Sequence, residues 1–263
     1  MSRDSEYHQR PEWSYSSMKQ ILKSGIDYAV GARKGLTPAP DSPHIDLGEC
    51  AHMMVLGGEA KDFALCEFPD FRTKAAREWK LEQEEAGKTI ITQSQFEVID
   101  NIVKNIENHP LSKEYLLGKG FKHEVELYAT AVSEDGSKIP LRGKADALKV
   151  IKNEALIITD IKTTAQFDDF KKRANWKDYD LQAAVYTLIG ASSMKINPNF
   201  VNYFFCVAET VKPYRVKYFH ASLEFLDAGE RKLHHCIEEI ADFGCKEPNF
   251  LYPEVEELGD FSL

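Results

Sequence analysis

Two aspartates and a lysine, Asp146, Asp160 and Lys162, are the side chains of this sequence best suited to chemistry. Asp160 follows the apolar residues 155–159, which predict a buried strand with Asp160 at its end. Alternate residues of a strand point to the same side, so Asp160 and Lys162 should project together. Carboxylates suit Mg²⁺, and an ammonium group beside them can stabilise charge on a phosphate. The pattern indicates a metal site for attack on a phosphodiester, with a salt bridge among the three side chains as the alternative.

Four other residues have types and positions that could complete such a site. Gln182 and Tyr186 lie four apart on a predicted helix over 179–191 and therefore share a face, although polar residues on a helix surface are the plain alternative. His52 lies in an apolar predicted helix that opens at Asp46, where a core histidine is the more frequent role. Glu124 lies on a predicted strand and could supply a further carboxylate or face solvent.

A basic run with an exposed aromatic could contact nucleic acid. It consists of Lys171, Lys172 and Arg173, followed by Trp176, which could stack on a base. A solvated charged face is the alternative. The net charge of −9 argues against a protein that coats nucleic acid, since duplex affinity comes mainly from Lys and Arg. This net charge does not exclude a nuclease whose basic residues form a local channel.

Composition narrows the class of protein. The five cysteines are scattered with no CxxC pair, which favours reduced thiols in a cytoplasmic protein over disulfides or zinc. No apolar run reaches the length of a membrane span, and the first residues have no hydrophobic signal region, so we expect no membrane association.

The predicted elements indicate an α/β fold with a mixed central sheet flanked by helices. Residues 1–118 are expected to be mainly helical, with helices over 14–24, 46–58, 92–108 and 111–117 and a proline-containing loop over 31–43. Residues 119–263 are expected to hold strands over 123–132, 139–151, 155–163, 200–208 and 214–220, with helices over 166–174, 179–191 and 222–243. We expect one domain over 1–263, made of these two parts.

Taken together, the motifs resemble the PD-(D/E)xK nuclease superfamily, in the RecB-like branch that includes RecE-like (exonuclease VIII-type) phage and prophage exonucleases. The matching positions, in family order, are Gly48-xxx-His52, Gly143-Lys144-Ala145-Asp146, Asp160-Ile161-Lys162 and Gln182-xxx-Tyr186. The resemblance implies a restriction-endonuclease-like core. It also implies metal ligation by His52, Asp146, Asp160 and the Ile161 backbone carbonyl, with Glu124 as an additional acidic ligand. Lys162 would be the catalytic lysine, and Gln182 and Tyr186 would position this lysine or the DNA backbone.

The resemblance further implies a function. It is a Mg²⁺- or Mn²⁺-dependent exonuclease that degrades linear double-stranded DNA, 5′→3′, and leaves 3′ single strands for recombination in the cytoplasm of a bacterial host. Implied partners are DNA ends, a RecT-like single-strand annealing protein and further copies of the chain in a ring. The cysteine spacing excludes the iron–sulfur cluster of some relatives. The alternatives are a structure- or sequence-specific endonuclease, a non-catalytic DNA- or partner-binding module, and a metabolic hydrolase with the same metal site.

Overall fold

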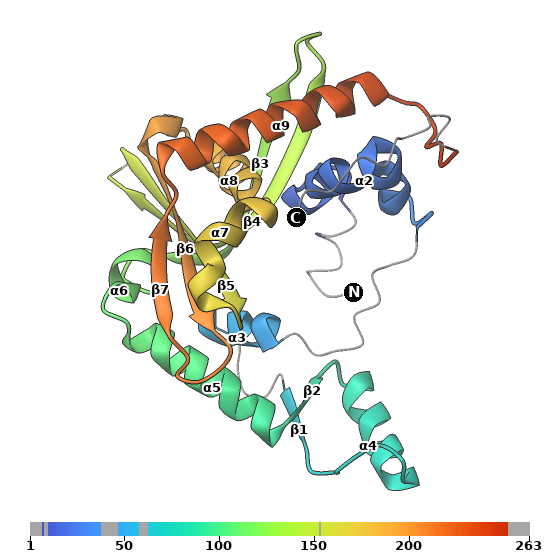
Figure 1. The fold of residues 1–263 in the computed structure, drawn as a ribbon, viewed down its shortest axis with the longest axis vertical. Helices are drawn as coiled ribbons and strands as arrows, with labels where there is room; N and C mark the ends of the chain where they lie inside the picture. Colours follow the sequence, from blue (N-terminus) through green and yellow to red (C-terminus); the bar gives the residue numbers. More distant parts are fainter. Residues whose placement is uncertain (1–6, 8–9, 38–46, 58–62, 153, 252–263) are drawn as a thin grey trace, which may run out of the picture.

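A computed structural model of the 263-residue chain describes residues 7, 10–37, 47–57, 63–152 and 154–251. Its centre is a five-stranded mixed sheet with the order β3-β4-β5-β6-β7 (Figure 1). The strands are β3 (Lys122–Val132), β4 (Lys138–Ile151), β5 (Ala155–Thr164), β6 (Val201–Glu209) and β7 (Val216–His220). Only the β5–β6 pair within this sheet is parallel, and the other three pairs are antiparallel. The predicted mixed sheet flanked by helices is confirmed.

Helices cover both faces of this sheet. On one face, α8 (Tyr179–Met194) packs across β3 to β6, and α9 (Leu223–Phe243) and α2 (Tyr15–Arg33) pack on α8. On the other face lie α3 (Leu47–Val55) and α5 (Gln93–Asn108). Figure 1 shows α5 on the side of the sheet away from α9. Alternate residues of β5 divide between the two cores: Leu156 and Ile158 face the α8 side, whereas Ile161 faces the α5 side. The same alternation places Asp160 beside α8.

Local sequence signals account for the helix ends. Ser14 and Thr92 form capping boxes with Ser17 and Gln95, and Ser222 caps α9, so three helices begin where their caps predict. The helix α2 is longer than the predicted 14–24, because the chain bends at Gly25, with φ of 80°, and then resumes the helix.

The N-terminal part contains more than helices. Between α3 and α5 lie β1 (Phe63–Cys66), α4 (Lys74–Glu85) and β2 (Thr89–Thr92), and the two strands pair in parallel. Strands of four residues are too short to show an alternation, which is why this small sheet was not predicted. The remaining short elements are α6 (Ser112–Tyr115), η2 (Phe167–Asp169), α7 (Phe170–Trp176) and η3 (Pro198–Phe200).

Two predictions concern residues outside the described ranges, namely the helix start at Asp46 and residues 38–43 of the proline-containing loop. Residues 31–33 were expected in that loop but belong to the end of α2. Among the described helices, none combines the length and the apolarity needed to cross a lipid bilayer.

Candidate active site

Asp146 lies where β4 and β5 separate. Their pairing stops at Ala147 opposite Thr159, one residue short of Asp146 and Asp160. Beyond this point the Asp146 side chain connects the two strands, because its Oδ2 accepts a hydrogen bond of 2.7 Å from the backbone N–H of Ile161. The strand predicted over 155–163 is confirmed, and it places Asp160 inside the strand rather than at its end: β5 continues to Thr164, and β6 pairs with it from Leu156 to Thr164. The site therefore lies over the middle of the sheet, at a gap between two strands.

Side chains from three separate elements converge at this gap. His52 Nε2 from α3 lies 2.9 Å from Asp146 Oδ1 and 3.9 Å from Glu124 Oε1 of β3. One ligand atom from each residue lies within 4.8 Å of the other two, close enough for a single metal ion. The structure thus brings together the predicted residues His52, Glu124 and Asp146.

Glu124 holds an unusual backbone conformation in the middle of a strand. Its φ is 54°, in the left-handed region that residues with a Cβ seldom adopt. Its neighbours His123 and Val125 pair normally with Ala147 and Ala145, so the irregularity is confined to the residue opposite Asp146. Such strain costs about 1–3 kcal/mol and clusters at functional sites. Glu124 also forms an ion pair with Lys144, a residue the sequence analysis did not assign to the site. Its position two residues before Asp146 on one strand was the available signal.

Asp160 and Lys162 project together, as their spacing predicts. Lys162 Nζ lies 2.7 Å from Asp160 Oδ2, and the Asp160 carboxylate is only 9% exposed. Gln182 Nε2 of α8 donates a 2.5 Å hydrogen bond to Asp160 Oδ1. Apart from the ion pair, Asp160 Oδ2 has no hydrogen-bond partner in the described part of the chain. This buried oxygen keeps the capacity to face a further cation, although Asp160 is not part of the converging trio.

Tyr186 fixes the backbone of β4. Its hydroxyl donates to the Lys144 carbonyl at 3.1 Å and accepts from the Lys144 N–H at 3.3 Å. The ring lies against Gly143, where a Cβ would come within 3.2 Å of it. Gln182 and Tyr186 thus act on different partners, Asp160 and β4, rather than both on Lys162. The carbonyl of Ile161 as a ligand stays a prediction.

Burial and charge shift the protonation of these groups. Burial raises the pKa of Asp160 to about 6, against the opposing charge of Lys162. Burial acts to lower the pKa of Lys162, but the carboxylates of Asp160 and Asp146 outweigh it and the pKa is raised, so the ammonium form prevails. The pKa of His52 is likewise raised, because the hydrogen bond and charge of Asp146 exceed the effect of burial. The clustered carboxylates thus raise the pKa of both Lys162 and His52.

The predicted basic run lies on α7, which follows β5 through η2. Trp176 is 81% exposed, and Lys171 and Lys172 are exposed, with Lys172 Nζ 3.9 Å from Asp169. Arg173 is half-buried and lies close enough to Tyr179 for its charge to act on that group. Contact of these residues with DNA stays a prediction.

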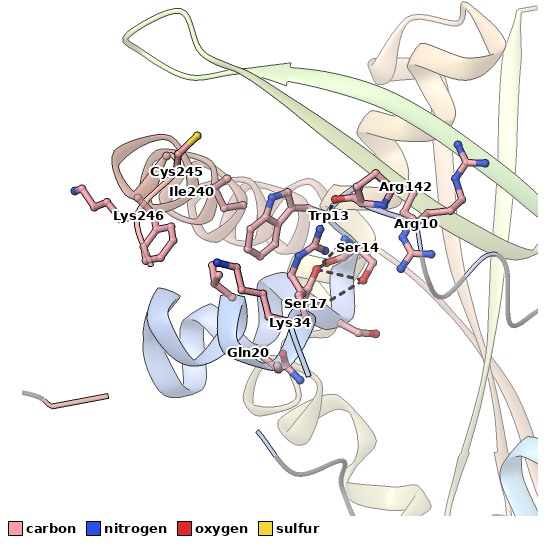
Figure 2. A pocket seen from close by; sticks show the side chains of 17 residues that line it. Arg10, Trp13, Ser14, Ser17, Gln20, Lys34, Arg142, Ile240, Cys245 and Lys246 are labelled. Carbon is pink, nitrogen blue, oxygen red and sulfur yellow. Dashed lines mark hydrogen bonds between the residues drawn. The ribbon is translucent and has the colours of Figure 1, made fainter. Parts of the chain in front are cut away.

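A cavity of about 830 Å³ lies elsewhere on the same side of the sheet as α2 (Figure 2). Figure 2 shows its walls, which come from the start and end of α2, the end of α9 and Arg142 of β4. None of the predicted site residues lines it. The converging ligand atoms, rather than the volume of a cavity, locate the site.

The donor set fits a divalent cation. One imidazole nitrogen and two carboxylate oxygens, from His52, Glu124 and Asp146, could hold the ion, with Asp160 next to them. When bound, such an ion supplies positive charge for a phosphate oxygen and lowers the pKa of a water molecule. Lys162 can donate hydrogen bonds to an attacking water or a phosphate oxygen, and Gln182 keeps Asp160 oriented. This arrangement is suited to hydrolysis of a phosphodiester.

A mixed sheet that places two aspartates and a lysine together on adjacent strands defines a PDDEXK-like fold. The family described as "PDDEXK-like domain of unknown function (DUF3799)" matches residues 14–248, and the chain belongs to it. The predicted PD-(D/E)xK superfamily is therefore confirmed, and membership supports a nuclease.

One solved structure agrees on the fold. A protein from Eubacterium rectale described as a "putative exonuclease" superposes with a TM-score of 0.59 and 14% sequence identity, covering 99% of this chain and 96% of the other. At that identity the likeness concerns the fold alone. The structure of SSO0001, at 14% identity, covers 70% of this chain and 84% of the other with a TM-score of 0.31, which is too low to bear on the argument. No curated protein matches the sequence.

Proposed function

We propose that this protein is a metal-dependent exodeoxyribonuclease that acts on linear double-stranded DNA. The observation that carries the proposal is the convergence of His52, Glu124 and Asp146 within ion-binding distance, beside the buried Asp160–Lys162 pair. The donor set is compatible with Mg²⁺, and its imidazole makes Mn²⁺ equally suitable. The E. rectale protein of similar fold is described as a "putative exonuclease", which supports attack from an end.

The finer features of the proposal come from the RecE-like motifs. The enzyme would degrade one strand 5′→3′ and leave 3′ single strands for recombination, in the cytoplasm of a bacterial host. Copies of the chain would form a ring around DNA and act with a RecT-like annealing protein. A ring would reconcile DNA binding with the net charge of −9, because basic residues could line its channel. Light scattering of the purified protein measures the number of copies.

Comparison of linear with covalently closed plasmid DNA tests attack from an end. With Mg²⁺ or Mn²⁺ the protein should degrade the linear form and leave closed circles intact, and EDTA should stop the reaction. Duplexes labelled at the 5′ or the 3′ end then give the polarity, with early release of the 5′ label expected. Degradation of closed circles at a comparable rate would overturn the exonuclease proposal in favour of an endonuclease.

A further inference from the structure

A second lysine lies near Lys162, contributed by the N-terminal half of α2. Lys19 is half-buried, and its Nζ lies 2.8 Å from the Lys177 carbonyl and 3.4 Å from the Tyr15 hydroxyl. Both partners are neutral oxygens. Within the described ranges no carboxylate lies in ion-pair distance of Lys19, whereas the neighbouring Asp178 is paired with Lys232. Lys19 thus carries a positive charge that the surrounding protein does not neutralise by direct pairing.

The ring of Tyr179 links this lysine to Lys162. Lys162 Nζ lies 5.0 Å from the ring centroid, and Lys19 Nζ lies 6.0 Å from the same centroid. Ammonium groups at such distances from an aromatic face are attracted to it. Tyr179 precedes Gln182 by three residues and so shares its face of α8. One face of α8 therefore contacts both members of the Asp160–Lys162 pair.

The charges around Lys19 favour an anionic ligand. Burial lowers the pKa of Lys19, and the positive charges of Lys23, Lys177 and Lys162 lower it further, against the opposing charge of Asp178. Like charges gathered at one place are unfavourable, and a polyanion that binds there relieves the repulsion. The chemistry of the site proposed above supplies such a polyanion in the backbone of the substrate.

There is also open space on this side of the site. A cavity of about 220 Å³ is lined by Ser14, Tyr15 and Ser16 at the start of α2 and by Lys144 and Tyr186 of the site. The start of α2 and the site residues of β4 and α8 therefore border the same open volume. Tyr15, whose hydroxyl contacts Lys19, lies between this cavity and the proposed phosphate contact.

We propose that Lys19 binds the DNA phosphate adjacent to the scissile one, and that Tyr179 is a positioning residue that holds Lys162 through its ring. The inference rests on the proposed function and goes beyond it by naming the subsite that aligns the strand. Lys19 contacts substrate throughout the reaction, whereas Tyr179 acts mainly through Lys162, whose Nζ lies nearer to its ring than that of Lys19 does. The two residues should therefore affect different kinetic constants.

The substitution Lys19→Ala tests the phosphate contact. Loss of one charge-assisted contact should raise KM about tenfold with kcat little changed. It should also reduce the slope of log affinity against log salt concentration by about 0.9, the value for one duplex phosphate. The matched control is Lys138→Ala, an exposed lysine at the far end of β4, which should leave both quantities at wild-type values. Equal KM and salt slope for wild type and Lys19→Ala would overturn the assignment.

Tyr179 is tested by two substitutions that differ in the ring. Tyr179→Leu should lower kcat about 3- to 30-fold, the range expected for loss of a cation–ring contact, with KM nearly unchanged. Tyr179→Phe keeps the ring and should retain most of the wild-type kcat. If Phe and Leu are equally impaired, the ring does not position Lys162 and this part of the inference is wrong.

Binding without cleavage separates the inference from the proposed function. Fluorescence anisotropy of a short duplex with the Lys162→Ala protein in EDTA reports affinity whether or not DNA is cut. Addition of Lys19→Ala to that protein should weaken binding about tenfold and reduce the salt slope. A protein that binds in this way but never cleaves DNA contradicts the nuclease proposal alone. A protein that cleaves DNA but is indifferent to Lys19 contradicts the inference alone.

Discussion

Substitution of Gly143 by alanine should loosen the contact between β4 and α8 that holds the site. A Cβ at this position would overlap Ile189 Cδ1 and lie 3.2 Å from Cε1 and Cζ of the Tyr186 ring. The Ile189 methyl group is the end of a flexible side chain and can turn away, but the Tyr186 ring is held by two hydrogen bonds to Lys144. The chain must therefore both move the ring and repack Ile189.

The expected cost follows from these contacts. Overpacking of a core by one methyl group costs about 1–3 kcal/mol. For a chain of this size, each kcal/mol lowers the melting temperature by roughly 2–4 °C. Displacement of the Tyr186 hydroxyl should also shift the backbone of Lys144, two residues before Asp146, and so weaken cation binding. Thermal unfolding and calorimetric titration with Mn²⁺ measure the two effects.

A compensating change makes the reasoning specific. Ile189→Val removes Cδ1, the atom that the new Cβ would overlap. Alone, Ile189→Val should lower the free energy of unfolding by about 0.5–1.5 kcal/mol. The double variant with Gly143→Ala should lose about 1 kcal/mol less than the summed losses of the two single variants. Strict additivity would refute the claim that Ile189 opposes a side chain at position 143. Cation affinity should recover only in part, because the contact with Tyr186 remains.

Two other predictions concern single residues. Glu124→Gly should be more stable to thermal unfolding than Glu124→Ala, by about 1 kcal/mol, because glycine adopts a φ of 54° without strain. Both variants should lose the Mn²⁺ binding that calorimetry measures. Equal stability of the two variants would mean that position 124 is unstrained. Glu209→Gln should lower stability at pH 7, because the Arg215 side chain, 2.7 Å away, holds the pKa of Glu209 below its usual 4.5. A carboxyl group whose pKa is lower in the folded than in the unfolded protein stabilises the fold above its unfolded-state pKa, and this stabilisation is lost as the pH falls through its folded-state pKa. The urea midpoints of wild type and Glu209→Gln should therefore converge as the pH falls from about 5 toward 2. A difference that stays constant over this range would contradict this account.

The sequence alone predicts the strands of the five-stranded sheet. The strands from residue 122 to residue 220 contain apolar runs or alternation long enough to predict each of them within two residues. The small β1–β2 sheet was missed because each strand has four residues. The i and i+2 spacing of Asp160 and Lys162 predicted a contact that the structure contains.

Other parts of the site depend on contacts between distant segments. His52 alone had the pattern of a core histidine, and only the family resemblance related it to Asp146. The left-handed conformation of Glu124 has no counterpart in local sequence, since glutamate does not favour it. Lys19 and Lys162 both lie against the ring of Tyr179 through the packing of α2 and β5 on α8, which no periodicity in one segment can predict.

The most direct test of the account is the rate of cleavage of a linear duplex as a function of Mn²⁺ concentration, for wild type, Asp146→Asn and Lys162→Ala. Asp146→Asn removes a proposed ligand and should require much more Mn²⁺ for half-maximal rate. Lys162→Ala keeps the ligands and should retain the wild-type Mn²⁺ requirement while the plateau falls by about 10²–10³, the usual effect of removing one transition-state donor. Cleavage by Lys162→Ala at the wild-type rate, or an unchanged Mn²⁺ requirement in Asp146→Asn, would contradict the assignment of this site.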